Sequence, residues 1–477
     1  MPVTDILEIG KQGMDANRQA LQTTSHNIAN ANTPGFSRQR TQMATQEQPP
    51  GGHVRINGVQ VKETIRVHDQ FVQKRIVSEA QVLGGVQARR DGLRMVEDLI
   101  HNDAYRVNDM VNKFFNDFRD LSAHPETSSM RTNVAFAAKQ AAVGFRELSG
   151  NLNSLKATLD NQIGAAIDRV NTLGREVADL NGQIEQAQAR GEEPLELLDR
   201  RDAAVRELGS KIGLQETADG KGRVNLSAGG VGVLVNGTTF NEMTVMRTPA
   251  DGDKTAGSVD VFIKDGNGLR KTTPVIKDGE VGGLLYVRDQ VVNPALNHLD
   301  SVAYEFADNV NKAHREGVGA DGVSGRDLFA KPEALQGAAG LLQISDAIDK
   351  NPSCVAVGMS AGAPSDNRVA LAIAGLQGER LMPEHVGSGS GAGRYTLNDS
   401  LTAMVGKVAV EAQHEENNLA HQDSIMRQLE NYRQSVSGVN LDEEAVSMMQ
   451  YQAAFNASAK AMKVGDEMLR TILSIKD

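Results

Sequence analysis

The architecture of the chain follows from residues 7–37, which read LEIGKQGMDANRQALQTTSHNIANANTPGFS. The large apolar residues Leu7, Met14, Leu21 and Ile28 recur every seventh position, which places them on one narrow seam of a helix. A residue before a proline avoids the helical region, and a glycine after it accepts a positive φ. We therefore expect a helix that ends in a sharp turn at residues 33–36.

The opposite end of the chain repeats this pattern. Its seam consists of Leu441, Met448, Phe455, Met462 and Leu469, again at intervals of seven, after a break at residues 437–438 and a capping residue at 440. On both helices the interleaved positions are mostly small or polar, so each helix alone buries too little area to offset its ordering entropy. We predict that the two terminal helices pair as a coiled coil and serve as an assembly device. An ordinary intramolecular coiled coil within one monomer is the alternative.

Helical periodicity dominates from about residue 71 to residue 214, with breaks near His124 and Pro125 and again at residues 191–194. Glycine- and aspartate-rich turns then separate short β-branched runs up to about residue 286, which indicates a β insert. Helical spacing returns at 291–313, and a long polar helix is expected from 397 to 435. Residues 41–68 favour irregular or extended structure, with a short hairpin around Asn57 and Gly58.

The predicted fold is therefore mainly α with a β-rich insert. We expect an innermost terminal helical domain (1–50 plus 437–477), a helical rod domain with some β structure (51–215 plus 286–436), and a small outward β-rich domain (216–285). This division agrees with the length of 477 residues, since roughly 150 residues per domain predicts about three units.

Composition narrows the possible partners. The formal net charge is −11, which argues against a nucleic acid, whose binding depends on neutralising phosphates. Aromatic residues make up only 4% of the chain and tryptophan is absent, so we expect thin helical layers of aliphatic side chains rather than a core built around large rings.

Location is indicated only weakly by composition. The single cysteine, Cys354, excludes an intrachain disulfide framework. The first residues lack the basic and apolar regions of a cleavable signal peptide, and no apolar run approaches the roughly 20 residues that span a bilayer. We expect no Sec-type export and no membrane insertion.

Several short motifs resemble chemical sites without their required context. Residues 317–322 satisfy G-x-G-x-x-G but follow a helical pattern rather than a strand, and the glycine-serine run 387–393 lacks the lysine of a phosphate loop. His414 begins a zinc-protease pattern, but Asn418 replaces the second histidine. The sequence around Cys354, residues 351–357, offers no neighbouring base. The pairs Arg89–Arg90 and Arg200–Arg201 suggest solvated, ion-paired helix faces. We expect no enzyme activity, metal site or cofactor.

Residues 25–37, SHNIANANTPGFS, resemble the N-terminal signature of the bacterial flagellar axial family, which contains rod, hook and hook-associated proteins. The residues of this signature are Asn27, Asn30, Thr33, Pro34, Gly35 and Phe36. The charged run 197–202, LLDRRD, and the ending from 437 to 455 are most similar to the hook-associated members.

This resemblance implies a structural adaptor of the bacterial flagellum at the junction between hook and filament. Members of the family are exported by the flagellar type III system without a cleaved signal and function outside the cell. The implied partners are further copies of the chain in a ring, hook protein, hook-associated protein 3, and an export chaperone that binds the C-terminal helix.

Two alternatives differ from this function. A hook or distal-rod subunit of the same family would form long tubes, although the charged helix around Asp199 argues against it. A wall-cleaving hydrolase would need a carboxylate pair or a metal cluster, and we identify neither in the sequence with the required spacing.

Overall fold

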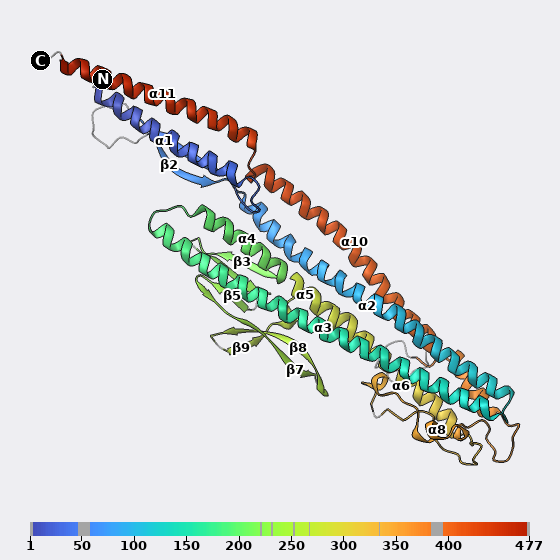
Figure 1. The fold of residues 1–477 in the computed structure, drawn as a ribbon. Helices are drawn as coiled ribbons and strands as arrows, with labels where there is room; N and C mark the ends of the chain where they lie inside the picture. The colour runs from blue at the N-terminus through green and yellow to red at the C-terminus, as the bar shows by residue number, and fades with distance from the viewer. Residues whose placement is uncertain are drawn as a thin grey trace.

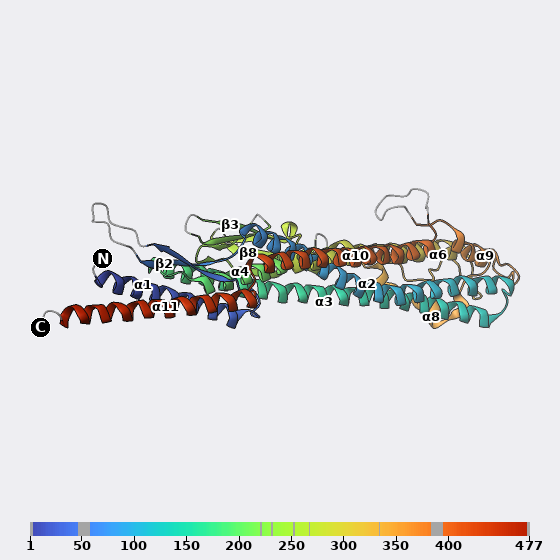
Figure 2. The ribbon, with the colours of Figure 1, turned by 90° about the horizontal axis from the view of Figure 1, so that it is seen from above.

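A computed structural model describes residues 3–45, 58–219, 222–229, 232–250, 253–266, 268–332, 334–382 and 395–474. The molecule is long and narrow and mostly helical, with the two chain termini together at one end (Figures 1 and 2). Four helices of 34 residues or more provide most of its length. They are α2 (Gln70–Ala123), α3 (Ser128–Ala189), α10 (Leu397–Ser437) and α11 (Leu441–Ser474).

Shorter helices complete the helical layers. They are α1 (Val3–Asn30), α4 (Leu195–Lys211), α5 (Gly279–Tyr286), α6 (Asn293–Arg315), α7 (Ala338–Leu341), α8 (Asp346–Lys350) and α9 (Arg368–Gly375). A π-helical turn, η2 (Val287–Val292), joins α5 to α6, and the 3-10 turns are η1 (Thr273–Val275), η3 (Pro352–Cys354) and η4 (Leu376–Gly378).

The breaks between the long helices are those that the sequence predicts. Helix α2 ends at Ala123, immediately before His124 and Pro125, and α3 ends at Ala189 before the turn at Gly191. Asn440 caps α11, because its side-chain Oδ1 accepts a hydrogen bond of 3.0 Å from the Asp442 amide. Proline and capping chemistry therefore fix the ends of the helices.

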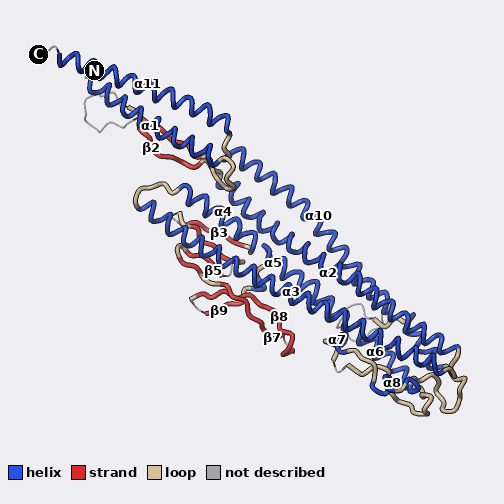
Figure 3. The backbone as a smooth tube through the Cα atoms, in the orientation of Figure 1, coloured by secondary structure: helices blue, strands red, loops and turns tan. Residues whose placement is uncertain are grey.

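Three antiparallel sheets contain the described strands, which are red in Figure 3. Strand β1 (Gln39–Thr45) pairs with β2 (Val59–Arg66) beside α1. Strands β3 (Leu214–Ala218), β4 (Val224–Ala228), β5 (Gly232–Asn236) and β6 (Thr239–Phe240) form a second sheet, and β7 (Met243–Ala250), β8 (Asp253–Asp265) and β9 (Gly268–Lys271) form a third. The partner of β2 is thus β1, and residue 57 of the expected hairpin lies outside the described residues.

The second and third sheets pack on α3, and buried polar side chains join them to it. Asn171 of α3 bonds both the amide and the carbonyl of Met243 at the start of β7. Arg288, in the π-helical turn, donates to Asp160 of α3 at 2.9 Å and to the carbonyl of Val259 in β8. Arg288 is fully buried, and the carboxylates of Asp160 and the adjacent Asp289 compensate its charge. Its bond to Val259 connects the third sheet to α3.

The core differs from the expected aliphatic layers at the end far from the termini. Six of the twelve phenylalanines gather there in edge-on, tilted and stacked contacts, all of them at most 1% exposed. They are Phe114, Phe115, Phe118, Phe145, Phe306 and Phe329. The prediction against a ring-centred core was wrong, because a low total of aromatic residues does not prevent the few that exist from clustering.

Helix α10 runs back along α2, and the character of their contact changes along its length. Leu401, Met404 and Val408 enter the main core, whereas nearer the termini the contact is polar. There Gln422 donates to Glu79, and Arg89 lies 3.3 Å from Glu415. None of the described helices is long and apolar enough to cross a membrane.

Candidate functional site

The signature segment folds into a tight turn that ends α1. The side chain of Asn30 donates to the carbonyl of His26 and accepts from the hydroxyl of Thr33, at 3.0 and 3.2 Å. Gly35 has a φ of 83°, which a residue with a Cβ rarely adopts. The ring of Phe36 then packs edge-on against His26 at 5.4 Å. The predicted helix end and glycine turn are confirmed.

Asn27 of α1 connects three segments that are distant in sequence. Its side chain exchanges two hydrogen bonds with the backbone of Gln39, of 2.8 and 2.9 Å, as a neighbouring strand would. It also donates to Glu444 of α11 at 3.1 Å. Glu444 is 2% exposed and accepts a 2.7 Å hydrogen bond from Arg38. The signature turn, β1 and the start of α11 are therefore held by one buried carboxylate.

Arg38 also pairs with Glu443. Burial alone would lower the pKa of the Arg38 guanidinium, but its hydrogen bonds to Glu443 and Glu444 and their negative charges raise that pKa above its ordinary value. Arg38 therefore stays charged, and so does the link between the signature turn and α11.

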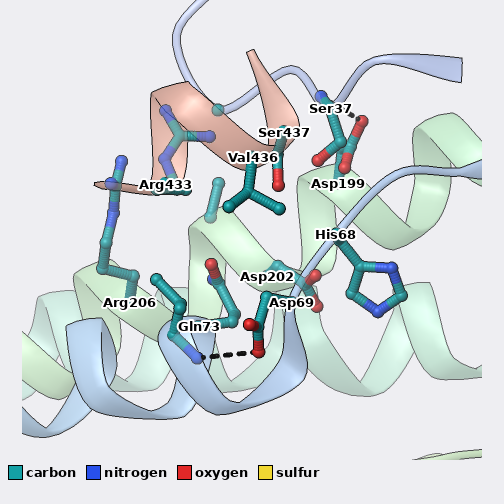
Figure 4. A pocket seen from close by; sticks show the side chains of 13 residues that line it. Ser37, His68, Asp69, Gln73, Asp199, Asp202, Arg206, Arg433, Val436 and Ser437 are labelled. Atoms are coloured by element: carbon teal, nitrogen blue, oxygen red, sulfur yellow. Dashed lines mark hydrogen bonds between the residues drawn. The ribbon is translucent and has the colours of Figure 1, made fainter. Parts of the chain in front are cut away.

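Asp199 of α4 binds the signature turn to the helical layers (Figure 4). One carboxylate oxygen accepts from the Ser37 amide at 3.1 Å, and the other from Arg66 at 2.8 Å. Arg66 lies at the end of β2 and also pairs with Asp202 at 2.8 Å. The side chains of Arg66 and Asp199 are only 8% and 11% exposed, so Asp199 depends on Arg66 for charge compensation, and Arg66 on Asp199 and Asp202.

The run 197–202 thus has a role that its charge pattern alone did not indicate. Arg200 is exposed, as predicted, but Arg201 is buried and donates to the carbonyl of Gly222 at 2.9 Å. Burial lowers the pKa of Arg201. The prediction of a solvated face is therefore wrong for Arg201, because the β3–β4 turn covers it, and periodicity gives no signal of such cover.

Helices α1 and α11 lie side by side along most of their length (Figures 1 and 2). Glycines lie where the two helices come closest. A methyl carbon added at Gly13 would lie 2.7 Å from the Ser458 hydroxyl, one at Gly465 would lie 3.1 Å from Leu7, and one at Gly10 would lie 3.3 Å from the Ser458 carbonyl and 3.4 Å from Met462. On α1 the fully buried residues are small or polar ones, namely Gly10, Gly13, Ala16, Asn17, Ala20, Thr24 and Asn27.

The predicted seam residues are less deeply buried than the small residues of this contact. Leu7, Met14, Leu21, Ile28, Met448, Phe455, Met462 and Leu469 are half-buried, and Leu441 is exposed. Leu7 and Met462 lie against the facing glycines, so the structure brings these two seams to the same helix pair. Sequence analysis missed Arg66, Asp199 and Glu444, whose roles arise only when distant segments meet.

The other sequence motifs have structural settings without site character. Residues 317–322 follow α6 and precede no long helix, and 387–393 lie outside the described residues. His414 is bonded to Asn418 on the exposed side of α10. Cys354 is buried near Asp321, and burial and that carboxylate raise the pKa of its thiol. No cluster of metal-binding side chains occurs among the described residues.

Comparison with known proteins shows near full-length correspondence. The chain is 26% identical to flagellar hook-associated protein 1 of Bacillus subtilis, over 98% of this chain and 97% of that protein. It is 25% identical to flagellar hook-associated protein 1 of Escherichia coli, over 99% of this chain and all of that protein. Residues 93–329 match the model of the flagellar hook-associated protein FlgK helical domain. The chain belongs to the flagellar hook-associated protein 1 family.

Both chain ends agree with this family assignment. Residues 7–36 match the flagella basal body rod protein model, and residues 432–475 match the model of the FlgEFG basal body rod protein C-terminal region. The fold is similar to a solved flagellar hook junction protein FlgK from Burkholderia pseudomallei. That similarity has a TM-score of 0.67 at 14% identity and covers 76% of this chain and all of that one.

Proposed function

We propose that this chain is the structural adaptor that joins the flagellar hook to the filament. The observation that carries the proposal is the correspondence with curated hook-associated proteins 1 over nearly the whole of both chains. We further propose export by the flagellar type III system and assembly outside the cell as a ring of copies.

The terminal helices are the proposed assembly device, paired as a coiled coil. Ala16 and Ala20 are the only apolar side chains fully buried among the described residues of α1 and α11. The large apolar seam residues of the two helices are only half-buried in a single copy. Because stabilisation scales with buried apolar area at about 25 cal/mol per Å², neighbouring copies that cover the rest of these side chains would add to the stability of the pair.

Helix α11 retains much apolar surface for such neighbours. Its exposed large apolar residues are Leu441, Val446, Met449, Val464, Met468, Ile472 and Leu473. Exposed apolar surface on this scale is uncommon in a finished monomer. It supports contacts with further copies, with hook protein and hook-associated protein 3 in the flagellum, and with an export chaperone before secretion.

The sheets β3–β6 and β7–β9 are the proposed outward domain. They pack on α3, and in Figures 1 and 3 the sheet β7–β9 lies on the side of α3 opposite α10. With α1 and α11 innermost, this arrangement would place the sheets on the outer surface of a ring.

Charged substitutions on the seams test the proposal. In a strain that lacks the gene, Leu21→Asp and Phe455→Asp should leave bare hooks and filament subunits in the medium, because a charge cannot be buried unpaired. The adjacent exposed positions provide matched controls, Gln22→Asp and Asn456→Asp, which should restore filaments. Filaments on hooks with either seam variant, or purified wild-type protein that polymerises into long tubes, would contradict the proposed function.

A further inference from the structure

The molecule contains two bodies that share no hydrophobic core. We call α1, β1, β2 and α11 the terminal module and residues 70–437 the rod. Among the described residues, the main core runs from Val77 to Ala412 and includes no residue of the terminal module. Among the described elements, the chain passes between the two bodies after β2 and after α10. The terminal module is therefore attached without the packing that fixes most domains.

Hydrogen bonds and ion pairs make the connection instead. The Ser37 amide and Arg66 bond to Asp199, as described above. His26 of α1 lies 3.2 Å from Glu196 of α4, and the Arg38 amide donates to the carbonyl of Ser437 at 2.9 Å. Polar contacts of this kind exchange with water at a modest net cost, whereas separating packed apolar surfaces costs free energy in proportion to area.

Open space lies next to these contacts. A groove of about 550 Å³ separates Thr23, Gln39 and Thr64 of the terminal module from the turn that joins α3 to α4. A smaller cavity of about 30 Å³ lies beside Asp199 between the signature turn and the end of α10 (Figure 4). The terminal module thus has room to tilt toward the α3–α4 turn without displacing side chains of the core.

We infer that the terminal module pivots on the rod about the contacts of Asp199, and that the Asp199–Arg66 ion pair sets its resting direction. This pivot rests on the proposed function and would give the adaptor a property beyond joining hook and filament. An adaptor between two different tubes meets a different lattice on each side, and a pivot lets the terminal helices follow one lattice while the rod follows the other. Each body keeps its own fold during the movement.

Spin-label distances in the full chain test this inference. In a Cys354→Ser background, labels at Gln22→Cys and Gln188→Cys span the groove between terminal module and rod. A second pair, Ala157→Cys with Gln188→Cys, lies within α3 and reports on the rod alone. All three labelled positions are exposed.

The variant Asp199→Asn removes the carboxylate charge of Asp199, keeps the side-chain size, and leaves Arg66 paired with Asp202 alone. We expect it to broaden the distance distribution across the groove at least twofold, and 1 M NaCl to broaden that of the wild type in the same sense. The distribution within α3 should not change. Glu207→Gln provides the matched control, because this residue of α4 pairs with Arg169 inside the rod.

A distribution across the groove that is insensitive to both Asp199→Asn and salt, whether narrow or broad, would overturn the inference. Equal broadening by Glu207→Gln would do the same. The measurement uses free protein, so its failure is distinct from a failure to form the junction, which the capping of hooks reports.

Discussion

The close approach of α1 and α11 gives a quantitative prediction for Gly10→Leu. The first carbon of the new side chain would already lie 3.3 Å from the Ser458 carbonyl and 3.4 Å from Met462, so the remaining carbons do not fit without separating the helices. Overpacking of this kind costs about 1–3 kcal/mol, and the gain in helix propensity over glycine returns about 0.8 kcal/mol. We expect a net loss of about 0.2–2.2 kcal/mol, which is a fall of up to about 40-fold in the pairing equilibrium.

The assay is competition for isolated hook ends between the variant and differently labelled wild-type protein. Lys11→Leu serves as the control, because it adds the same side chain one residue away on the exposed side of α1. Gly10→Leu should be depleted from the hooks relative to Lys11→Leu, by up to about 40-fold. Equal incorporation of the two variants would refute the close packing of the terminal helices as the basis of assembly.

Three further predictions concern the rod. In α3, Gly164→Ala should raise the free energy of unfolding by about 0.5–1 kcal/mol, because nothing lies within 4 Å of the new methyl group. Gly174→Ala should lower it, because the new methyl group would lie 2.4 Å from the ring of Phe240. Calorimetry of both variants checks this prediction, and a Gly174→Ala protein more stable than Gly164→Ala would contradict it. The buried Cys354 thiol, whose pKa is raised, should react with a thiol reagent at pH 8 far more slowly in native than in denatured protein, and equal rates would exclude the burial described here. A hydrogen bond to the Glu411 carboxylate of α10 is the largest cause, and burial the second, that raises the pKa of Tyr286 to about 12. The stability that the protonated phenol provides is therefore present below about pH 10 and is lost as the pH rises through 12. Tyr286→Phe should lose less stability than the wild type between these pH values in an alkaline denaturation series, and identical profiles would count against this prediction.

Local chemistry made the helix ends and the terminal helices predictable. Heptad spacing identified α1 and α11, proline and glycine marked the turn after Asn30, and Asn440 was recognisable as a cap. These signals depend on residues within one or two helical turns of each other, which a single sequence contains.

Contacts between distant segments could not be predicted in this way. Asp199 binds the Ser37 amide across 162 positions, and Asn27 reaches Glu444 across 417. Residue spacing singles out neither Asp199 nor Glu444. Asp199 binds the Ser37 amide and Arg66, and Glu444 binds Asn27 and Arg38, and only the fold brings these groups together. The phenylalanine cluster was missed for the same reason, since total composition carries no information about where rings meet.

The central claim is that α1 and α11 are barely stable as a pair in one copy and become stable on assembly. Amide hydrogen exchange at residues 5–30, in dilute monomer and in protein assembled on hooks, tests it most directly. We predict protection factors below about 100 in the monomer, which corresponds to an opening free energy under about 2.7 kcal/mol, with much higher values in α3 and at least a 100-fold rise at residues 5–30 on assembly. Slow exchange throughout residues 5–30 in the monomer, equal to that in the assembled protein, would contradict the account.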